Sequence, residues 1–440
     1  MDLDSAMRTV RDLFDAAVAA VDVRAAVRRT LAVADGGLTV GGEDVPLAPG
    51  GRLFVVAFGK AAAAMAAEAE AILGDRIAAG VAITKYGNAE PTRTVEVREA
   101  GHPTPDEAGR RAAQEVSDLL AGTTPDDVVL CLISGGGSAL LTAPAEGIGL
   151  DDLRATTDAL LAAGATINEL NAVRKHLETL KGGGLAAAAA PARVVALAVS
   201  DVLGDPLDVI ASGPTVGDTS TYDDAWGVIE RYHLAEKVPA SVAARLRAGR
   251  RDEAPETPRP DDPLFRRVRT LVVANLRMAA EGAARRARDL GYDVAFLDLA
   301  IEGEAREVGQ RLAARAREAR DEAGGGRRCL IGGGETTVTV RGDGLGGRNT
   351  EVALAAALAL DGVDGVALAS LASDGDDGST KSAGAVATGE TVARGRARGL
   401  DAADSLARND SARYFERAGG LLVTGPTQTN VADLYVILLD

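Results

Sequence analysis

Continuous apolar runs alternate with segments of helical periodicity along this 440-residue chain. The runs 53–58, 128–133 and 194–199 have the length and composition of buried strands of a parallel sheet. Apolar residues in 5–33 and 167–177 recur every three or four positions, which predicts helices with one buried face. The alternation predicts the α/β class, with two Rossmann-like lobes whose sheets are mainly parallel.

A proline-rich, charged segment interrupts this pattern near the middle of the chain. Prolines amid charges are typical of linkers, and a new strand-like run, 270–273, follows. We therefore expect an N-terminal Rossmann-like domain at 1–250, a linker at 251–265 and a C-terminal α/β domain at 266–440.

Two strand-like runs, almost two hundred residues apart, each lead into three glycines: LISGGGSALL and LIGGGETTV. Glycines let backbone N–H groups crowd round an anion where a Cβ atom would collide, although they also serve simple sharp turns. Two such loops in separate halves predict a ligand cleft between the lobes, at the carboxyl ends of the strands. The expected phosphate- or nucleotide-binding residues are Ser134, Gly135, Gly136, Gly137, Ser138, Gly333, Gly334, Glu335 and Asn349.

One lysine and one arginine are the expected catalytic residues. Lys60 follows the strand 53–58 and precedes a helix, where a cation is unfavourable by about 0.3–1 kcal/mol unless an anion joins it or it points to solvent. Arg348 lies beside glycines near a second helix start, and an arginine in that place also needs an anion.

Other candidates come from loops and from one basic helix. His102 lies in a stiff loop, where it serves structure or contacts substrate; Arg174 and Lys175 belong to a basic cluster that lines an anionic-substrate site or forms a solvated helix face. Asp201 and Asp374 follow buried strands, where carboxylates are placed to hold Mg²⁺, although acidic turns are also plain solvated loops. No Cys/His cluster has zinc spacing.

The charge of the chain limits the classes of partner that it is expected to bind. The net charge is −16, and six of the 48 basic residues are lysines. This acidity disfavours binding to nucleic acid and to anionic membranes. An acidic, lysine-poor surface is similar to those of salt-adapted proteins. No apolar run approaches about 18 residues and no signal-peptide pattern is present, so we expect a cytoplasmic protein with no membrane contact. Cys131 and Cys329 lie in apolar runs and are expected to be buried and reduced.

Several motifs together resemble the glycerate 2-kinase family, whose C-terminal region is called the MOFRL domain. They run in family order from about Phe58 to Leu434: AFGKAA, AGHPTPDEAG, LISGGGSALL, NAVRKHLETLKGGGLA, SDVLGDPLDVIASGPT, GGGETTVTVRGDGLGGRNTE, SDGDDGS and TGPTQTNVADL. The resemblance implies ATP-dependent phosphorylation of D-glycerate at its 2-hydroxyl, with Mg²⁺, in a cleft between two α/β lobes. It also implies that Lys60 and Arg348 are central to the active site.

Two other functions stay open at this point. A hydroxypyruvate reductase would need a nicotinamide site, but no G-x-G-x-x-G follows a strand with an acidic residue about 20 positions on. A non-catalytic sensor would bind ATP or glycerate without turnover. A kinase here would use a nucleotide site other than Walker A, since that motif is absent. The expected partner is the small-molecule substrate, and a homodimer is left open.

Overall fold

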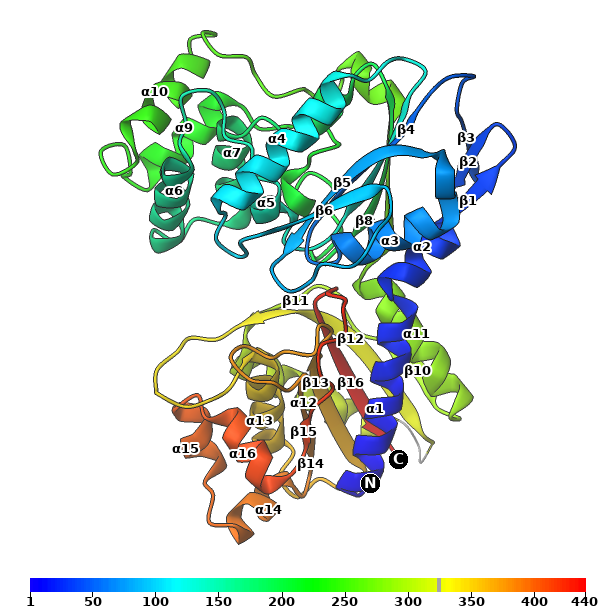
Figure 1. Cartoon of the computed structure of the whole chain (residues 1–440). Coiled ribbons are helices and arrows are strands. Elements are labelled where there is room, and N and C mark those ends of the chain that lie inside the picture. The colour runs from blue at the N-terminus through cyan, green and yellow to red at the C-terminus, as the bar shows by residue number, and fades with distance from the viewer. Residues whose placement is uncertain (323–325) are drawn as a thin grey trace. The chain divides into compact units, whose positions relative to one another are not determined.

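The computed structural model describes residues 1–322 and 326–440, and its chain forms two compact units (Figure 1). Unit 1 contains Met1–Asp22 and Ala274–Asp440, and unit 2 contains Val23–Val273. This division differs from the expected one, because the proline-rich segment 251–265 belongs to unit 2. There the N–H of Asp218 donates to the carbonyl of Pro258 at 2.8 Å, so this segment is part of a folded body.

Unit 2 is built on a six-stranded sheet of order β6-β5-β4-β7-β8-β9. The pairings from β6 through β8 are all parallel, as the apolar runs predict. Parallel strands place their carboxyl ends at one edge, and that edge carries the loops discussed below. The strands are β4 (Leu53–Phe58), β5 (Ile77–Lys85), β6 (Val95–Ala100), β7 (Val128–Ile133), β8 (Arg193–Val199) and β9 (Val268–Ala274).

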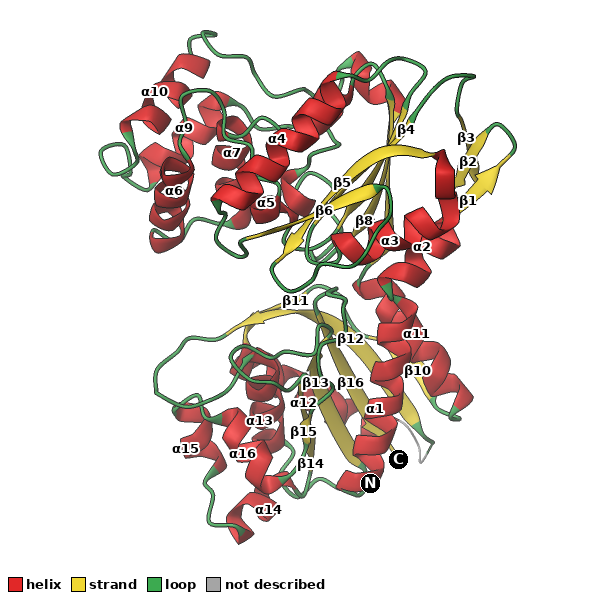
Figure 2. Cartoon of the chain, in the orientation of Figure 1, coloured by secondary structure: helices red, strands yellow, loops and turns green. Residues whose placement is uncertain are grey.

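Helices and a small antiparallel sheet complete unit 2 (Figure 2). Helix α4 (Glu107–Ala121) packs on β5, β6 and α8 (Gly184–Ala189), and α3 (Ala62–Leu73) contacts β4 through β7. A helical subdomain has its own apolar core, which includes Leu170, Val173 and Leu177 of the predicted stripe. Its helices are α6 (Leu150–Ala162), α7 (Ile167–Leu177), α9 (Tyr222–Arg231) and α10 (Ala240–Gly249). The remaining elements are α2 (Val23–Thr30), α5 (Gly137–Leu140), β1 (Leu31–Ala34), β2 (Gly37–Val40) and β3 (Glu43–Pro46).

Unit 1 has a mixed sheet of order β10-β12-β16-β13-β14-β15, with β11 also paired to β12. Only β10 and β11 run parallel to β12, because β16, the last strand, enters between β12 and β13 antiparallel to both. The α/β class is confirmed, whereas the mainly parallel sheet is a property of unit 2. The strands are β10 (Asp293–Phe296), β11 (Ile301–Glu304), β12 (Arg328–Thr337), β13 (Val366–Ala372), β14 (Gly384–Thr388), β15 (Leu421–Leu422) and β16 (Asp433–Leu439).

The first helix, α1 (Leu3–Ala20), joins unit 1 by packing along α11 (Leu276–Asp289), as Figure 1 shows. Gly282 of α11 permits this, since a Cβ there would lie 2.6 Å from that of Ala20. Helices α12 (Ala305–Glu322) and α13 (Arg348–Ala359) pack on each other and on β13. Helices α14 (Thr391–Ala397), α15 (Ala402–Ala407) and α16 (Ser411–Ala418) pack on α13.

Both cysteines are buried and unpaired, as their apolar surroundings predict. Burial raises the pKa of the Cys131 and Cys329 thiols to about 12. None of the helices that the structure describes has the length and apolar character needed to cross a bilayer.

Candidate functional site

The turns after β4 and β7 are joined by hydrogen bonds in unit 2. The N–H of Lys60 donates to the carbonyl of Gly135 at 2.9 Å, and the N–H of Ala61 donates to Ser134 Oγ at 3.0 Å. In return the N–H of Ser134 donates to the carbonyl of Phe58 at 3.1 Å. The adjacent parallel strands therefore bring Lys60 and the segment 134–138 to one place.

His102 lies against the same turn. Gly136 has a left-handed backbone (φ 82°), and a Cβ on it would lie 2.7 Å from His102 Nε2 and 3.3 Å from Lys60 Cγ. Burial, and then the charges of Lys60 and Lys85, lower the pKa of His102 to about 4. At neutral pH the loop therefore presents an uncharged imidazole beside the Lys60 side chain.

Lys60 carries a charge that no acidic residue of the described chain neutralises in an ion pair. Its backbone carbonyl is fixed, since Thr84 Oγ1 and Asn88 Nδ2 donate to it at 3.1 and 2.8 Å. Asp201, at the end of β8, lies beside the same turn, because a Cβ on Gly135 would collide with its carboxylate. A fixed backbone with an unpaired ammonium suits the binding of an anion.

The side chains of Arg174 and Lys181 support the segment 134–138 by donating to its backbone. Arg174 Nη2 donates to the carbonyl of Ser138 at 2.9 Å, and Lys181 Nζ donates to the same carbonyl at 2.8 Å. Lys181 is buried and lies 3.1 Å from Glu178, and burial lowers its pKa to about 8. Lys181 follows helix α7, and its contacts make it a support for the segment 134–138.

Lys175 has a closer acidic partner than Arg174, whose Nε lies 3.8 Å from the buried Glu178. Its ammonium lies 3.1 Å from Asp218 and 3.8 Å from Asp208, and the side chain is 5% exposed. The charge is already neutralised by a buried partner, which favours a structural role over the expected contact with substrate.

The second glycine segment is not a loop, so that expectation is wrong. Gly333 and Gly334 lie inside β12, paired with β16, and Gly334 is also paired with β11. The N–H of Gly333 donates to the carbonyl of Asp298 at 3.1 Å, and a Cβ on Gly334 would collide with the carbonyl of Ile301. Here the glycines permit close packing of backbone on backbone, a use that strand-then-glycine patterns share with ligand loops.

The start of α13 already holds an anion from the protein itself. The carboxylate of Asp377 accepts the N–H groups of Asn349 and Thr350, each at 2.8 Å. Asn349 is fully buried, and its Oδ1 accepts a hydrogen bond from Ser370 Oγ at 2.6 Å. These contacts favour a structural role for Asn349 over the expected phosphate contact.

Arg348, the first residue of α13, is only partly buried and contacts two carboxylates. It lies 2.7 Å from Asp433 and 2.5 Å from Glu335. Glu335 is one of the expected phosphate-binding residues, whereas Asp433 lies in the motif TGPTQTNVADL and had no role assigned to it. The register of β12 with β16 pairs Gly334 with Asp433, and only the three-dimensional pairing reveals this neighbour.

The described residues form no cluster of three or more His, Cys, Asp or Glu side chains arranged to hold a metal ion. Asp201 belongs to unit 2 and Asp374 to unit 1, where Asp374 Oδ1 accepts the N–H of Asp376 at 3.1 Å. Magnesium in nucleotide enzymes is usually held by one or two carboxylates, with phosphate oxygens completing the shell. Single carboxylates at strand ends fit that pattern and do not fit a cage made by protein alone.

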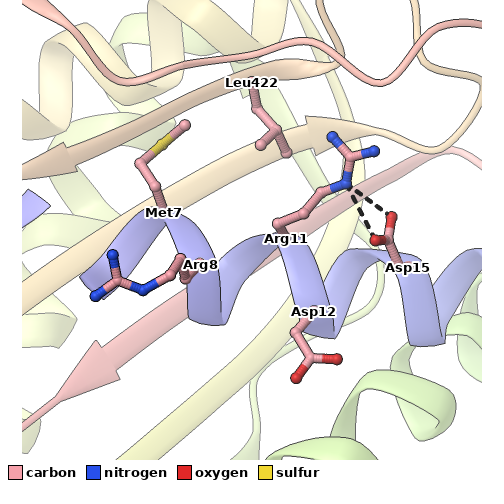
Figure 3. Close-up of a pocket in the computed structure, with 6 residues that line it drawn as sticks. All are labelled: Met7, Arg8, Arg11, Asp12, Asp15 and Leu422. Atoms are coloured by element: carbon pink, nitrogen blue, oxygen red, sulfur yellow. Dashed lines mark hydrogen bonds and ion pairs between the residues drawn. The ribbon is translucent and has the colours of Figure 1, made fainter. Parts of the chain in front are cut away.

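A hollow of about 410 Å³ on unit 1 is lined by none of these residues. Figure 3 shows its lining by α1 and by Leu422, with Arg11 paired to Asp15 at 3.0 Å. Asp12 is paired with Arg286 at 2.7 Å. Arg8 also lines the hollow, and its Nη2 donates to Ser5 Oγ at 3.0 Å.

Comparison with known proteins gives matches along nearly the whole chain. Residues 9–247 match the domain of unknown function DUF4147, and residues 328–433 match the MOFRL family. The D-glycerate 2-kinase of Thermotoga maritima is 42% identical over 402 residues, covering 90% of this chain and 93% of that protein. The glycerate 2-kinase of Pyrococcus horikoshii is 40% identical, covering 96% and 95%.

Two further matches bear on the assignment. A protein of Agrobacterium vitis named putative hydroxypyruvate reductase is 43% identical, covering 99% of this chain and 95% of that protein. The crystal structure of glycerate kinase from Thermotoga maritima superposes with a TM-score of 0.88 at 39% identity, covering 99% of this chain and all of that one. Identity at this level over the full length shows common ancestry and fold, and the chain belongs to the glycerate 2-kinase family.

Proposed function

We propose that this protein is an ATP-dependent kinase that phosphorylates D-glycerate at its 2-hydroxyl. The glycerate oxygen would form a bond to the γ-phosphorus of ATP as the bond to ADP breaks, and the hydroxyl proton would leave to a base. The products are 2-phosphoglycerate, ADP and a proton. The observation that carries the proposal is Lys60, fixed at the junction of two strand ends in a chain about 40% identical to glycerate 2-kinases. No carboxylate among the described residues forms an ion pair with it.

Phosphoryl transfer depends mainly on positioning and on neutralising negative charge. Lys60 would stabilise charge on the transferred phosphoryl group, and the backbone of the segment 134–138 would position phosphate oxygens. Arg348 is proposed as the second cation for that group. Arg348 is held in place by the carboxylates described above.

The substrate and the metal are assigned to further residues of the two units. His102, uncharged at neutral pH, can exchange hydrogen bonds with a hydroxyl or a carboxylate without adding charge. Arg174 is proposed to face the glycerate carboxylate, because its 3.8 Å pair with Glu178 is longer than the 3.1 Å pair of Lys175 with Asp218. Magnesium, when bound with ATP, would neutralise phosphate charge, with Asp201 or Asp374 among its ligands. Asp201 lies close enough to the turn to be the first choice as the base.

A reductase acting on hydroxypyruvate is the second candidate, because the Agrobacterium vitis relative bears that name. The turn after β4 argues against it. The sequence there is Gly59-Lys60-Ala61, and a dinucleotide pyrophosphate needs small residues at the start of the helix. A dinucleotide-binding loop has a small residue at this position, whereas this chain has the long side chain of Lys60.

The decisive test is incubation of purified protein with D-glycerate, ATP and Mg²⁺, at low and at high salt because the chain is strongly acidic. We expect 2-phosphoglycerate and equimolar ADP. Formation of 3-phosphoglycerate alone, or no ADP at either salt concentration, would contradict the kinase. Consumption of NADH with hydroxypyruvate would support the reductase, and tight binding of ATP without turnover would support a sensor.

A further inference from the structure

The guanidinium of Arg348 contacts two carboxylates that differ sharply in their surroundings. Nη2 donates to Asp433 Oδ1 at 3.0 Å and Nε lies 2.7 Å from Asp433 Oδ2, so this carboxylate contacts two nitrogens at once. On the other side Nη1 donates to Glu335 Oε1 at 2.5 Å. One cation thus faces two acidic groups within unit 1.

Asp433 is suited to be a permanent partner. Its side chain is 0% exposed, and it begins β16, the strand between β12 and β13. Burial raises the pKa of Asp433 to about 7, while the guanidinium opposes that rise. A buried carboxylate that loses its cation destabilises the folded protein, so Asp433 stays paired with Arg348.

Glu335 is suited to be a temporary partner. Its side chain is 47% exposed, and water can solvate its carboxylate when the ion pair opens. Exposed ion pairs contribute only about 0–1 kcal/mol, so another anion can displace this one at little cost. Arg348 itself is 31% exposed, which leaves part of the guanidinium accessible to a ligand.

Charge balance favours such an exchange. With Asp433 ionised, Arg348 is already neutralised, and Glu335 adds a negative charge where an anionic substrate would have to bind. Glu335 would repel a phosphate bound to the same guanidinium, because both groups are negatively charged. Movement of Glu335 into solvent removes that repulsion and frees Nη1 as a donor.

We infer that Asp433 is a positioning residue that fixes Arg348, and that Glu335 occupies the place of an anionic ligand and is released when that ligand binds. The ligand is a phosphate or carboxylate, and its identity as ATP or glycerate rests on the proposed function. Glu335 therefore weakens anion binding in the ligand-free protein. It competes with the phosphate that it was expected to contact.

The test compares two carboxylate-to-amide changes on opposite sides of one guanidinium, Glu335→Gln and Asp433→Asn. Glu302→Gln is the control. Glu302 lies opposite Glu335 in the β11–β12 ladder, and the substitution removes the same charge as Glu335→Gln does. Binding of inorganic phosphate is measured by calorimetry, and kcat and KM are measured for both substrates. Circular dichroism and thermal melting verify folding.

For Glu335→Gln we expect phosphate to bind about tenfold more tightly, a change of about 1.4 kcal/mol, with KM lowered for one anionic substrate. For Asp433→Asn we expect kcat to fall by about 100-fold with a smaller change in KM, because Arg348 loses its orientation. Asp433→Glu should restore part of kcat. Glu302→Gln should leave phosphate affinity within about twofold of wild type.

Unchanged or weaker phosphate binding by Glu335→Gln, or the same tightening by Glu302→Gln, would overturn the exchange. A folded Asp433→Asn protein with wild-type kcat would overturn the positioning role. If Asp433→Asn fails to fold, Asp433→Glu carries that test through its kcat. Failure of the wild type to phosphorylate glycerate would contradict the proposed function alone, since phosphate binding still tests the exchange.

Discussion

Lys175 and Asp218 form a buried ion pair, with Nζ 3.1 Å from Oδ1 and side chains that are 5% and 0% exposed. Asp218 also accepts from the N–H and the hydroxyl of Ser220 and from Thr257 Oγ1. Thr257 belongs to the proline-rich segment, so Asp218 ties that segment and helix α7 to one carboxylate. This network accounts for the packing of a sequence that composition alone identifies as a linker.

Replacing Lys175 by methionine is expected to destabilise unit 2. The change leaves Asp218 buried without its cation, and such a loss typically costs about 3–5 kcal/mol. Urea unfolding followed by circular dichroism measures it, with Lys237→Met, an exposed lysine of the same unit, as the control. A Lys175→Met protein with wild-type stability and a raised KM for glycerate would return Lys175 to the substrate site.

Replacing Gly136 by alanine is expected to reduce activity more than stability. The residue has φ 82°, and the new methyl group would press on His102 Nε2. Gly164→Ala is the control, because Gly164 has φ 80° and open space at its Cβ position. Both changes carry the backbone strain of about 1–2 kcal/mol, so their melting temperatures should fall together. Only Gly136→Ala should lower kcat/KM; equal kcat/KM in the two variants would remove His102 and this turn from the site.

The lowered pKa of His102 predicts a pH dependence of stability. The unfolded chain takes up a proton on this histidine near pH 6.5, whereas the folded protein resists protonation down to about pH 4. Stability should therefore be unaffected above pH 6.5 and fall between pH 6.5 and 4. The half-buried site reduces the effect to about 1–2 kcal/mol. His102→Asn should flatten this part of the profile, and the exposed His233→Asn should not.

Much of the fold follows from periodicity. Apolar runs located β4, β7 and β8, and the i, i+3, i+4 stripe located α7, because burial of one face dictates those spacings. The antiparallel entry of β16 between β12 and β13 was not predictable, since pairing between distant strands leaves no local pattern. The packing of α1 on α11 depends on Gly282, one glycine among 52.

Only some contacts of the candidate site residues could be predicted, because contacts between distant residues leave no local sequence pattern. Lys60 lies beside the segment 134–138 because each follows a buried strand, and the adjacent parallel strands β4 and β7 bring their carboxyl ends together. The strand-then-glycine pattern failed at Gly333 and Gly334, where the glycines serve strand packing. Asp377 and Asp433 lie in the motifs SDGDDGS and TGPTQTNVADL, but only their contacts with the start of α13 and with Arg348 reveal what each carboxylate does. A shared cleft for Lys60 and Arg348 stays a prediction.

Lys60→Met provides the most direct test of the catalytic assignment. No acidic residue in 1–322 or 326–440 forms an ion pair with Lys60, so its removal breaks no such bond and should leave the melting temperature within about 2 °C. If its charge stabilises the transferred phosphoryl group, kcat should fall by about 100- to 1,000-fold, the usual effect of losing one electrostatic contact to a transition state. Lys85→Met is the matched control, because Lys85 also lowers the pKa of His102.

Both lysine variants should raise the pKa of His102, which nuclear magnetic resonance can follow, since each removes a nearby positive charge. Only Lys60→Met should abolish turnover, and Lys60→Arg should retain part of it through its charge. If Lys60→Met keeps wild-type kcat while its His102 pKa rises, the lysine lies near the histidine without serving catalysis. The phosphoryl group would then need its cation from elsewhere in the chain.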